Sequence, residues 1–93
     1  MFRTPDREFI FILGHKILIE IDDIKLDKLE ADALFNLELI TLKSHYPSYD
    51  YYKRVFFHEC FHALCETLGC QLDHNLEETL ANTVSFMFMD FPV

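Results

Sequence analysis

The segment His58-Glu59-Cys60-Phe61-His62 constrains this chain more than any other stretch of its sequence. The two histidines are four residues apart, so on an α-helix they lie one above the other, where both imidazoles can bind the same ion. Glu59 lies about 100° around the helix from His58. From there it is poorly placed to ligate that ion but well placed to take a proton from water beside it. The spacing therefore predicts a helix that carries half of a catalytic zinc site.

Apolar residues around this motif predict a helix with one buried face. The pattern runs from about Tyr49 to Leu68, and Ser48 or Asp50 is available as the N-cap. Gly69 follows at the point where a helix of this length ends. The apolar positions that recur at helical spacing are Val55, Phe57, Phe61, Leu64 and Leu68.

Runs of β-branched and aromatic residues precede the motif helix. They cover residues 9–13 and 17–21, and Gly14 between them suits the turn of a hairpin. Residues 33–42 then alternate between polar and apolar side chains, which predicts a third strand with one apolar face. Residues 22–32 mix charged and apolar side chains, and they fit either a short helical turn or a surface loop.

A second helix is predicted after the link at residues 69–74. Asp73 or Asn75 can cap it, and the apolar spacing continues to about Met89. Ninety-three residues can support only one core. We therefore expect a single α+β domain over residues 1–93, in which a small three-stranded sheet packs on the motif helix and the second helix.

Composition excludes some classes of function and partner. The net charge is −8, with 16 acidic and 8 basic residues, which argues against nucleic-acid binding. The N-terminus has no apolar run typical of a signal peptide, and residues 9–21 are too short and too polar to span a membrane. We expect a cytosolic protein in which Cys60, Cys65 and Cys70 are reduced and serve mainly as small core residues.

A hydrolytic zinc site needs a third protein ligand, because the fourth position is left to water. The second helix offers Glu78, which shares a helix face with Asn82, so Glu78 can bind the ion while Asn82 orients a neighbouring group. Glu77 is the main alternative ligand. Cys65, on the same helix face as the second histidine, and His74 are further alternatives.

Residues 78–82 read Glu-Thr-Leu-Ala-Asn. They resemble the Glu-x-x-Ala-Asn signature that follows His-Glu-x-x-His in the ImmA/IrrE-type metallopeptidases, a branch of the gluzincin-like zinc peptidases. The resemblance covers residues 52–92, and residues 88–92 loosely match the family's Leu-Met-Pro ending. It implies a minimal zincin-like domain formed by the sheet and the two helices.

Carried over position by position, the resemblance implies that His58, His62 and Glu78 bind Zn²⁺. Glu59 would then be the general base and Asn82 a residue that orients a ligand. The implied activity is zinc-dependent hydrolysis of peptide bonds in an intracellular protein. A transcriptional repressor is the candidate substrate, because the family is associated with the cleavage of such repressors.

The sequence leaves other roles open. The third strand, if it lies at the sheet edge, can hold an extended peptide by strand addition. The alternative to a peptidase is a catalytically inactive, zincin-like protein-binding module with a structural zinc. Ten Phe in so small a domain favour a homodimer or docking on another protein, and residues 86–89 fit either the core or a partner-binding surface. The candidates for stabilising the oxyanion are His74, Tyr46, Tyr49, Tyr51 and Tyr52.

Overall fold

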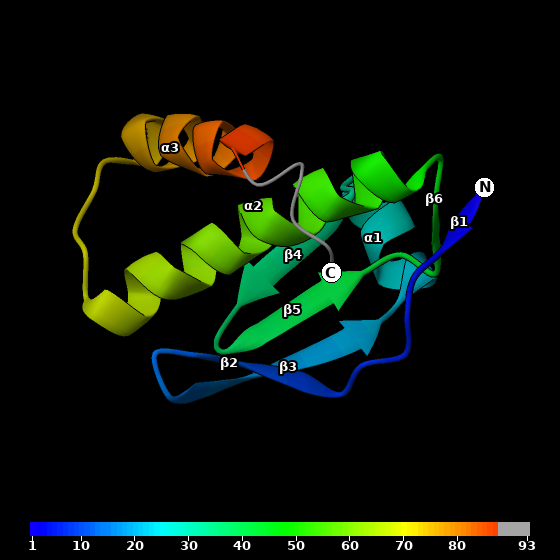
Figure 1. The fold of residues 1–93 in the computed structure, drawn as a ribbon, viewed down its shortest axis with the longest axis horizontal. Helices are drawn as coiled ribbons and strands as arrows, with labels where there is room; N and C mark the ends of the chain where they lie inside the picture. The colour runs from blue at the N-terminus through cyan, green and yellow to red at the C-terminus, as the bar shows by residue number, and fades with distance from the viewer. Residues whose placement is uncertain (88–93) are drawn as a thin grey trace.

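The computed structural model describes residues 1–87 of the chain. A sheet packs on one side of the long helix α2, and α3 runs along α2 (Figure 1). The predicted α+β fold is confirmed. In chain order the elements are β1 (Phe2–Arg3), β2 (Phe9–Ile12), β3 (His15–Ile21), α1 (Asp23–Leu29), β4 (Ala33–Asn36), β5 (Leu39–Leu42), β6 (His45–Tyr46), α2 (Tyr49–Leu68) and α3 (His74–Met87).

The main sheet has four strands in the order β2-β3-β5-β4. The predicted hairpin is confirmed, since β2 and β3 pair antiparallel from Phe9 opposite Leu18 to Ile12 opposite His15. Gly14 in its turn has a φ of 78°, a conformation that glycine adopts without strain. Strands β3 and β5 are parallel, whereas β4 and β5 are antiparallel. Strand β4 therefore lies at an edge of this sheet.

The prediction of one strand over residues 33–42, and with it a three-stranded sheet, is wrong. These residues form a hairpin of β4 and β5, and its turn is Leu37-Glu38, with φ values of 50° and 65°. Both turn residues adopt the left-handed conformation that asparagine and glycine usually supply. Contacts with β3 stabilise the turn, because Leu18 N donates to Glu38 O at 2.9 Å and the Glu38 carboxylate binds His15 Nε2 at 2.7 Å.

The segment that the sequence left open, residues 22–32, contains α1. Asp22 caps its N-terminus by accepting a hydrogen bond from Lys25 N at 3.0 Å, and Glu30 ends it in the left-handed conformation. Leu26 is fully buried on the inner face of this short helix. Helix α1 thus belongs to the crossover that lets β3 and β5 run parallel.

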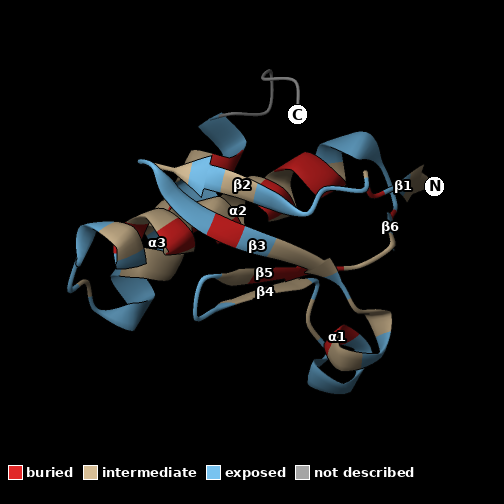
Figure 2. Ribbon diagram, turned by 90° about the horizontal axis from the view of Figure 1, so that it is seen from below, coloured by how far each residue is buried: buried red, intermediate tan, exposed pale blue. Residues whose placement is uncertain are grey.

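Helix α2 has the predicted bounds. Ser48 caps it by accepting from Tyr51 N at 3.1 Å, and Gly69 ends it with a φ of 68°. Its buried face packs on the sheet, and Figure 2 shows buried segments on α2, β3 and β5. The motif residue Glu59 lies on the same face, with 8 % of its surface exposed. The buried apolar cluster comprises Ile17, Ile40, Leu42, Tyr46, Tyr52, Phe56 and Ala63.

Helix α3 begins at His74, and Asp73 Oδ1 accepts from Asn75 N at 3.0 Å, so Asp73 rather than Asn75 is the cap. The predicted end near Met89 and the tail at 88–92 lie outside the described residues. Phe86 and Met87 are exposed, so the core interpretation of this run is wrong for these two residues. Over residues 1–87, no helix has both the length and the apolar composition needed to cross a bilayer.

Candidate metal centre

Side chains from two helices converge on one point. The Nε2 atoms of His58 and His62, both on α2, lie 3.1 Å apart. The carboxylate of Glu78, on α3, lies 3.3 Å from His58 Nε2 and 2.9 Å from His62 Nε2. Ligand atoms bound tetrahedrally to zinc are about 3.3 Å from one another, given bond lengths near 2.0 Å. The three side chains are therefore spaced as a zinc site requires, and they are the three that the sequence selected.

The connection between α2 and α3 explains this convergence. Gly69 ends α2 in the left-handed conformation, and Cys70 N donates back to Cys65 O at 2.9 Å. The chain then reverses within a few residues, and α3 packs along α2. Glu78 lies in the second turn of α3, opposite the motif. The short link therefore fixes which face of α3 meets the two histidines.

The second nitrogen of each histidine is also bound. His62 Nδ1 donates to Glu77 Oε2 at 2.5 Å, and His58 Nδ1 donates to Asn82 Oδ1 at 2.9 Å. Because each Nδ1 carries the proton, each Nε2 has its lone pair free to bind a metal ion. Asn82 thus has the orienting position that the resemblance implies.

Glu77 has a role that the sequence did not identify. Its carboxylate binds Nδ1 of His62, whereas the cluster uses Nε2. Glu77 therefore does not belong to the cluster formed by His58, His62 and Glu78. Metal-binding histidines ordinarily donate their second ring nitrogen to a carboxylate or a carbonyl. This rule could have suggested the role of Glu77 from the sequence, which is to position the imidazole of His62. Cys65 and His74, the other alternative ligands, are outside the cluster as well.

Burial keeps the imidazole of His58 in the form that binds metals. The side chains of His58 and His62 are only 19 % and 14 % exposed. Burial lowers the pKa of His58, while the Glu78 carboxylate beside it acts in the opposite direction. A neutral imidazole is the form that coordinates a metal ion.

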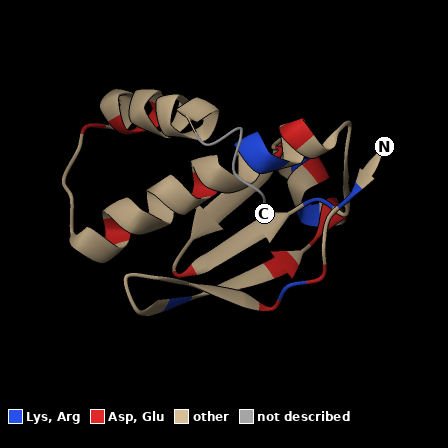
Figure 3. Cartoon of the chain, viewed as in Figure 1, with Lys and Arg blue, Asp and Glu red and all other residues tan. Residues whose placement is uncertain are grey.

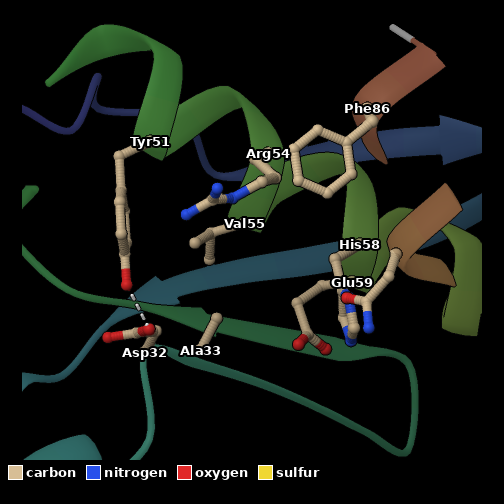
Figure 4. Close-up of a pocket in the computed structure, with 9 residues that line it drawn as sticks. Asp32, Ala33, Tyr51, Arg54, Val55, His58, Glu59 and Phe86 are labelled. Carbon is tan, nitrogen blue, oxygen red and sulfur yellow. Dashed lines mark hydrogen bonds between the residues drawn. The ribbon is translucent and has the colours of Figure 1, made fainter. Parts of the chain in front are cut away.

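Glu59 is adjacent to the cluster but does not belong to it. Its carboxylate points towards β4 beside the His58 imidazole (Figure 4). Burial, the main cause, raises the pKa of Glu59 from the usual 4.5 to about 7. A carboxylate with a pKa near neutrality can both accept and return a proton at physiological pH. The geometry and the pKa of Glu59 thus fit the predicted general base.

Burial of Glu59 should make the stability of the metal-free protein depend on pH. Because the pKa of Glu59 is raised in the folded state, the protonated side chain stabilises the fold. This contribution to the free energy of unfolding is fully present below about pH 4.5 and is lost as the pH rises through 7. Between pH 5 and pH 8, we expect the free energy of unfolding of the wild type to fall by up to about 3 kcal/mol relative to that of Glu59→Gln. Urea unfolding in the presence of a chelator measures this difference. Parallel pH profiles for the two proteins would contradict it.

Two cavities meet at the cluster, and Ala33 and Glu59 line both. The first, the His58 cavity, has a volume of about 530 Å³ and extends towards the start of β4. The second, the His62 cavity, has a volume of about 560 Å³ and extends towards the β4-β5 turn. Together they form a groove between the edge strand β4 and the two helices. The other residues of the His58 cavity are Asp32, Tyr51, Arg54, Val55, His58, Asn82 and Phe86. Those of the His62 cavity are Leu34, Phe35, Asn36, Leu37, His62, Glu66, Cys70, His74, Glu77 and Glu78.

Only two of the five candidates for stabilising an oxyanion line the groove. Tyr51 lines the His58 cavity and His74 lines the His62 cavity. Tyr46 and Tyr52 are buried in the core, each only 2 % exposed, so these two candidates are wrong. Tyr49 packs against the Phe2 ring and lines neither cavity.

The cysteines differ in burial. Cys65 is buried and Cys60 is half-buried, as expected of small core residues. Cys70 is exposed, because it follows Gly69 out of the helix, so the core interpretation is wrong for this residue.

Comparisons with protein-family models, with curated proteins and with solved structures found no match to this chain. Its function is therefore inferred from the geometry of the cluster and of the groove.

Proposed function

We propose that this protein is a zinc-dependent metallopeptidase of a minimal zincin-like type. The observation that carries the proposal is the convergence of His58, His62 and Glu78 beside a buried Glu59 that is not part of the cluster. Two imidazoles and one carboxylate are a common ligand set of hydrolytic zinc. The resemblance of residues 58–62 and 78–82 to the ImmA/IrrE-type metallopeptidases supports the same activity.

Each residue of the site has a distinct task in this proposal. His58, His62 and Glu78 hold the ion, while Glu77 and Asn82 keep the imidazoles in the required orientation. Zinc, when bound, acidifies water and polarises a carbonyl group. Glu59 takes the proton from the attacking water and returns it to the leaving amine.

The edge strand supports a polypeptide as substrate. Within residues 1–87, β4 is an edge strand, and it borders the groove because Ala33 lines both cavities and residues 34–36 line the His62 cavity. An extended peptide can add to such an edge through main-chain hydrogen bonds, which places its backbone beside the cluster. A transcriptional repressor is the candidate protein substrate, on the basis of the resemblance alone.

Cleavage of an unbiased peptide library tests the proposal with no assumption about the substrate sequence. We expect the zinc-loaded protein to generate new N-termini, detected by mass spectrometry, and the chelated protein to generate none. Re-addition of zinc should restore cleavage. A protein that binds one zinc ion but produces no new N-termini under any of these conditions would instead be the inactive binding module with a structural zinc.

A further inference from the structure

Arg54 lies in the His58 cavity, one helical turn before His58 on the same face of α2. Its guanidinium lies between two aromatic rings, with Cζ 4.8 Å from the ring centre of Tyr51 and 5.4 Å from that of Phe86. Figure 4 shows this side chain extending over Val55 into the cavity. The cation lies over the face of each ring, and such cation–π contacts help to hold the side chain in place. The guanidinium is also within hydrogen-bonding reach of the Tyr51 side chain, and because it carries five N–H donors, others are available to a ligand in the cavity.

Among residues 1–87, the positive charge of Arg54 is not matched by a carboxylate, since no acidic side chain of this part of the chain forms an ion pair with it. Asp32 lines the same cavity, but it accepts a hydrogen bond from the Tyr51 hydroxyl at 2.5 Å. Asp32 also lies 3.7 Å from Lys43 Nζ, so its negative charge is shared with that lysine. An arginine fixed in a cavity in this way lacks the bidentate acceptor that its geometry favours.

The charge of the groove changes from one end to the other. Figure 3 shows both basic and acidic residues in the first half of α2, but only acidic ones in its second half and in the first half of α3. Arg54 lines the His58 cavity, whereas Glu66, Glu77 and Glu78 line the His62 cavity. Asp32 and Glu59 also line the His58 cavity, but Arg54 is the only Lys or Arg among the described residues that line either cavity. Within the groove, a negatively charged group of a bound peptide therefore has a cationic partner only in the His58 cavity.

We propose that Arg54 binds a carboxylate of the peptide substrate in the His58 cavity. Four helical residues separate Arg54 from His58, a rise of about 6 Å. This distance corresponds to about two residues of an extended peptide. The carboxylate is thus an Asp or Glu side chain, or the C-terminus, within about two residues of the bond to be cleaved. This inference rests on the proposed function for its cleavage site, but the carboxylate-binding site exists independently of hydrolysis.

Nuclear magnetic resonance of the zinc-loaded protein tests the binding of a carboxylate directly. The probes are three acetylated alanine pentapeptides: one with a central Asp and an amidated end, one with a central Asn and an amidated end, and one of alanine with a free C-terminus. We expect the Arg54 Nε–H signal to shift with a carboxylate peptide but not with the Asn peptide. A shift with the Asp peptide identifies a side-chain carboxylate, and a shift with the free-ended peptide identifies the C-terminus.

Substitution provides the matched control. Arg54→Gln should weaken binding of the carboxylate peptide about 10- to 100-fold, as expected for the loss of a charge-assisted hydrogen bond, and should leave zinc content unchanged. Lys16→Gln removes the same charge from an exposed position outside both cavities, and should leave binding unchanged. Equal affinity of the Asp and Asn peptides, with no shift for the free-ended peptide, would overturn the proposal even if the protein cleaves peptides. Binding that depends on Arg54 without any cleavage would uphold the carboxylate site and reject the peptidase.

Discussion

Replacing Glu78 with glutamine is expected to weaken zinc binding by more than about 100-fold, the upper end of what an orienting residue contributes. The Glu78 carboxylate is within 3.3 Å of both Nε2 atoms, so the substitution removes an anionic ligand from the cluster. Glu77→Gln should have a smaller effect, about 10- to 100-fold, because Glu77 orients His62 without reaching the shared point. Competition against a chromophoric chelator at fixed pH measures both affinities.

Glu66 provides the matched control for these two substitutions. It lines the His62 cavity from α2 but is not part of the cluster, so Glu66→Gln removes the same charge without touching a ligand. The expected order of zinc affinities is therefore wild type and Glu66→Gln highest, Glu77→Gln lower and Glu78→Gln lowest. If Glu77→Gln lost as much affinity as Glu78→Gln, the assignment of the third ligand would have to be reversed.

Local signals in the sequence predicted the helices that carry the candidate site. Ser48 and Gly69 mark the ends of α2 because capping and the left-handed C-terminus depend on residues within one turn. The proximity of Glu78 to the histidines could be predicted for a related reason. A link of only a few residues joins α2 and α3, so the second helix is expected to pack on the first.

The β4-β5 hairpin could not be predicted in the same way. Leu37 and Glu38 have no turn signature, and polarity alternates straight through them. The contacts that stabilise the turn come from His15 and Leu18, about 20 residues earlier in the chain. Such long-range contacts override local propensity, and a pattern of neighbouring residues cannot predict them.

The burial of Glu59 depends on the same unpredicted hairpin. The sequence placed Glu59 on the flank of the helix, but its surroundings come from β4, whose Ala33 lines both cavities with it. Its raised pKa is therefore a property of the packed fold. Likewise, the role of Arg54 depends on the packing that brings Tyr51, Phe86 and the start of β4 together.

Replacing Glu59 with glutamine is expected to reduce peptide cleavage by about 10²- to 10⁴-fold, the usual contribution of a general base. Zinc affinity should stay within a few-fold of the wild type, because Glu59 is outside the cluster of His58, His62 and Glu78. The fold should also be retained, since an uncharged amide costs less to bury than a carboxylate. The measurements are kcat/KM on a peptide taken from the library and zinc content on the same sample.

The combination of these results separates a catalytic role of Glu59 from a structural one. Loss of cleavage with full zinc content and no loss of thermal stability identifies Glu59 as the base, and Glu66→Gln, with the same chemical change in the neighbouring cavity, should keep wild-type activity. Cleavage that persists in Glu59→Gln would remove this residue from the mechanism. Among residues 1–87, Glu59 is the only acidic side chain that lines both cavities, so its position differs from those of Asp32 and Glu66, each of which lines only one.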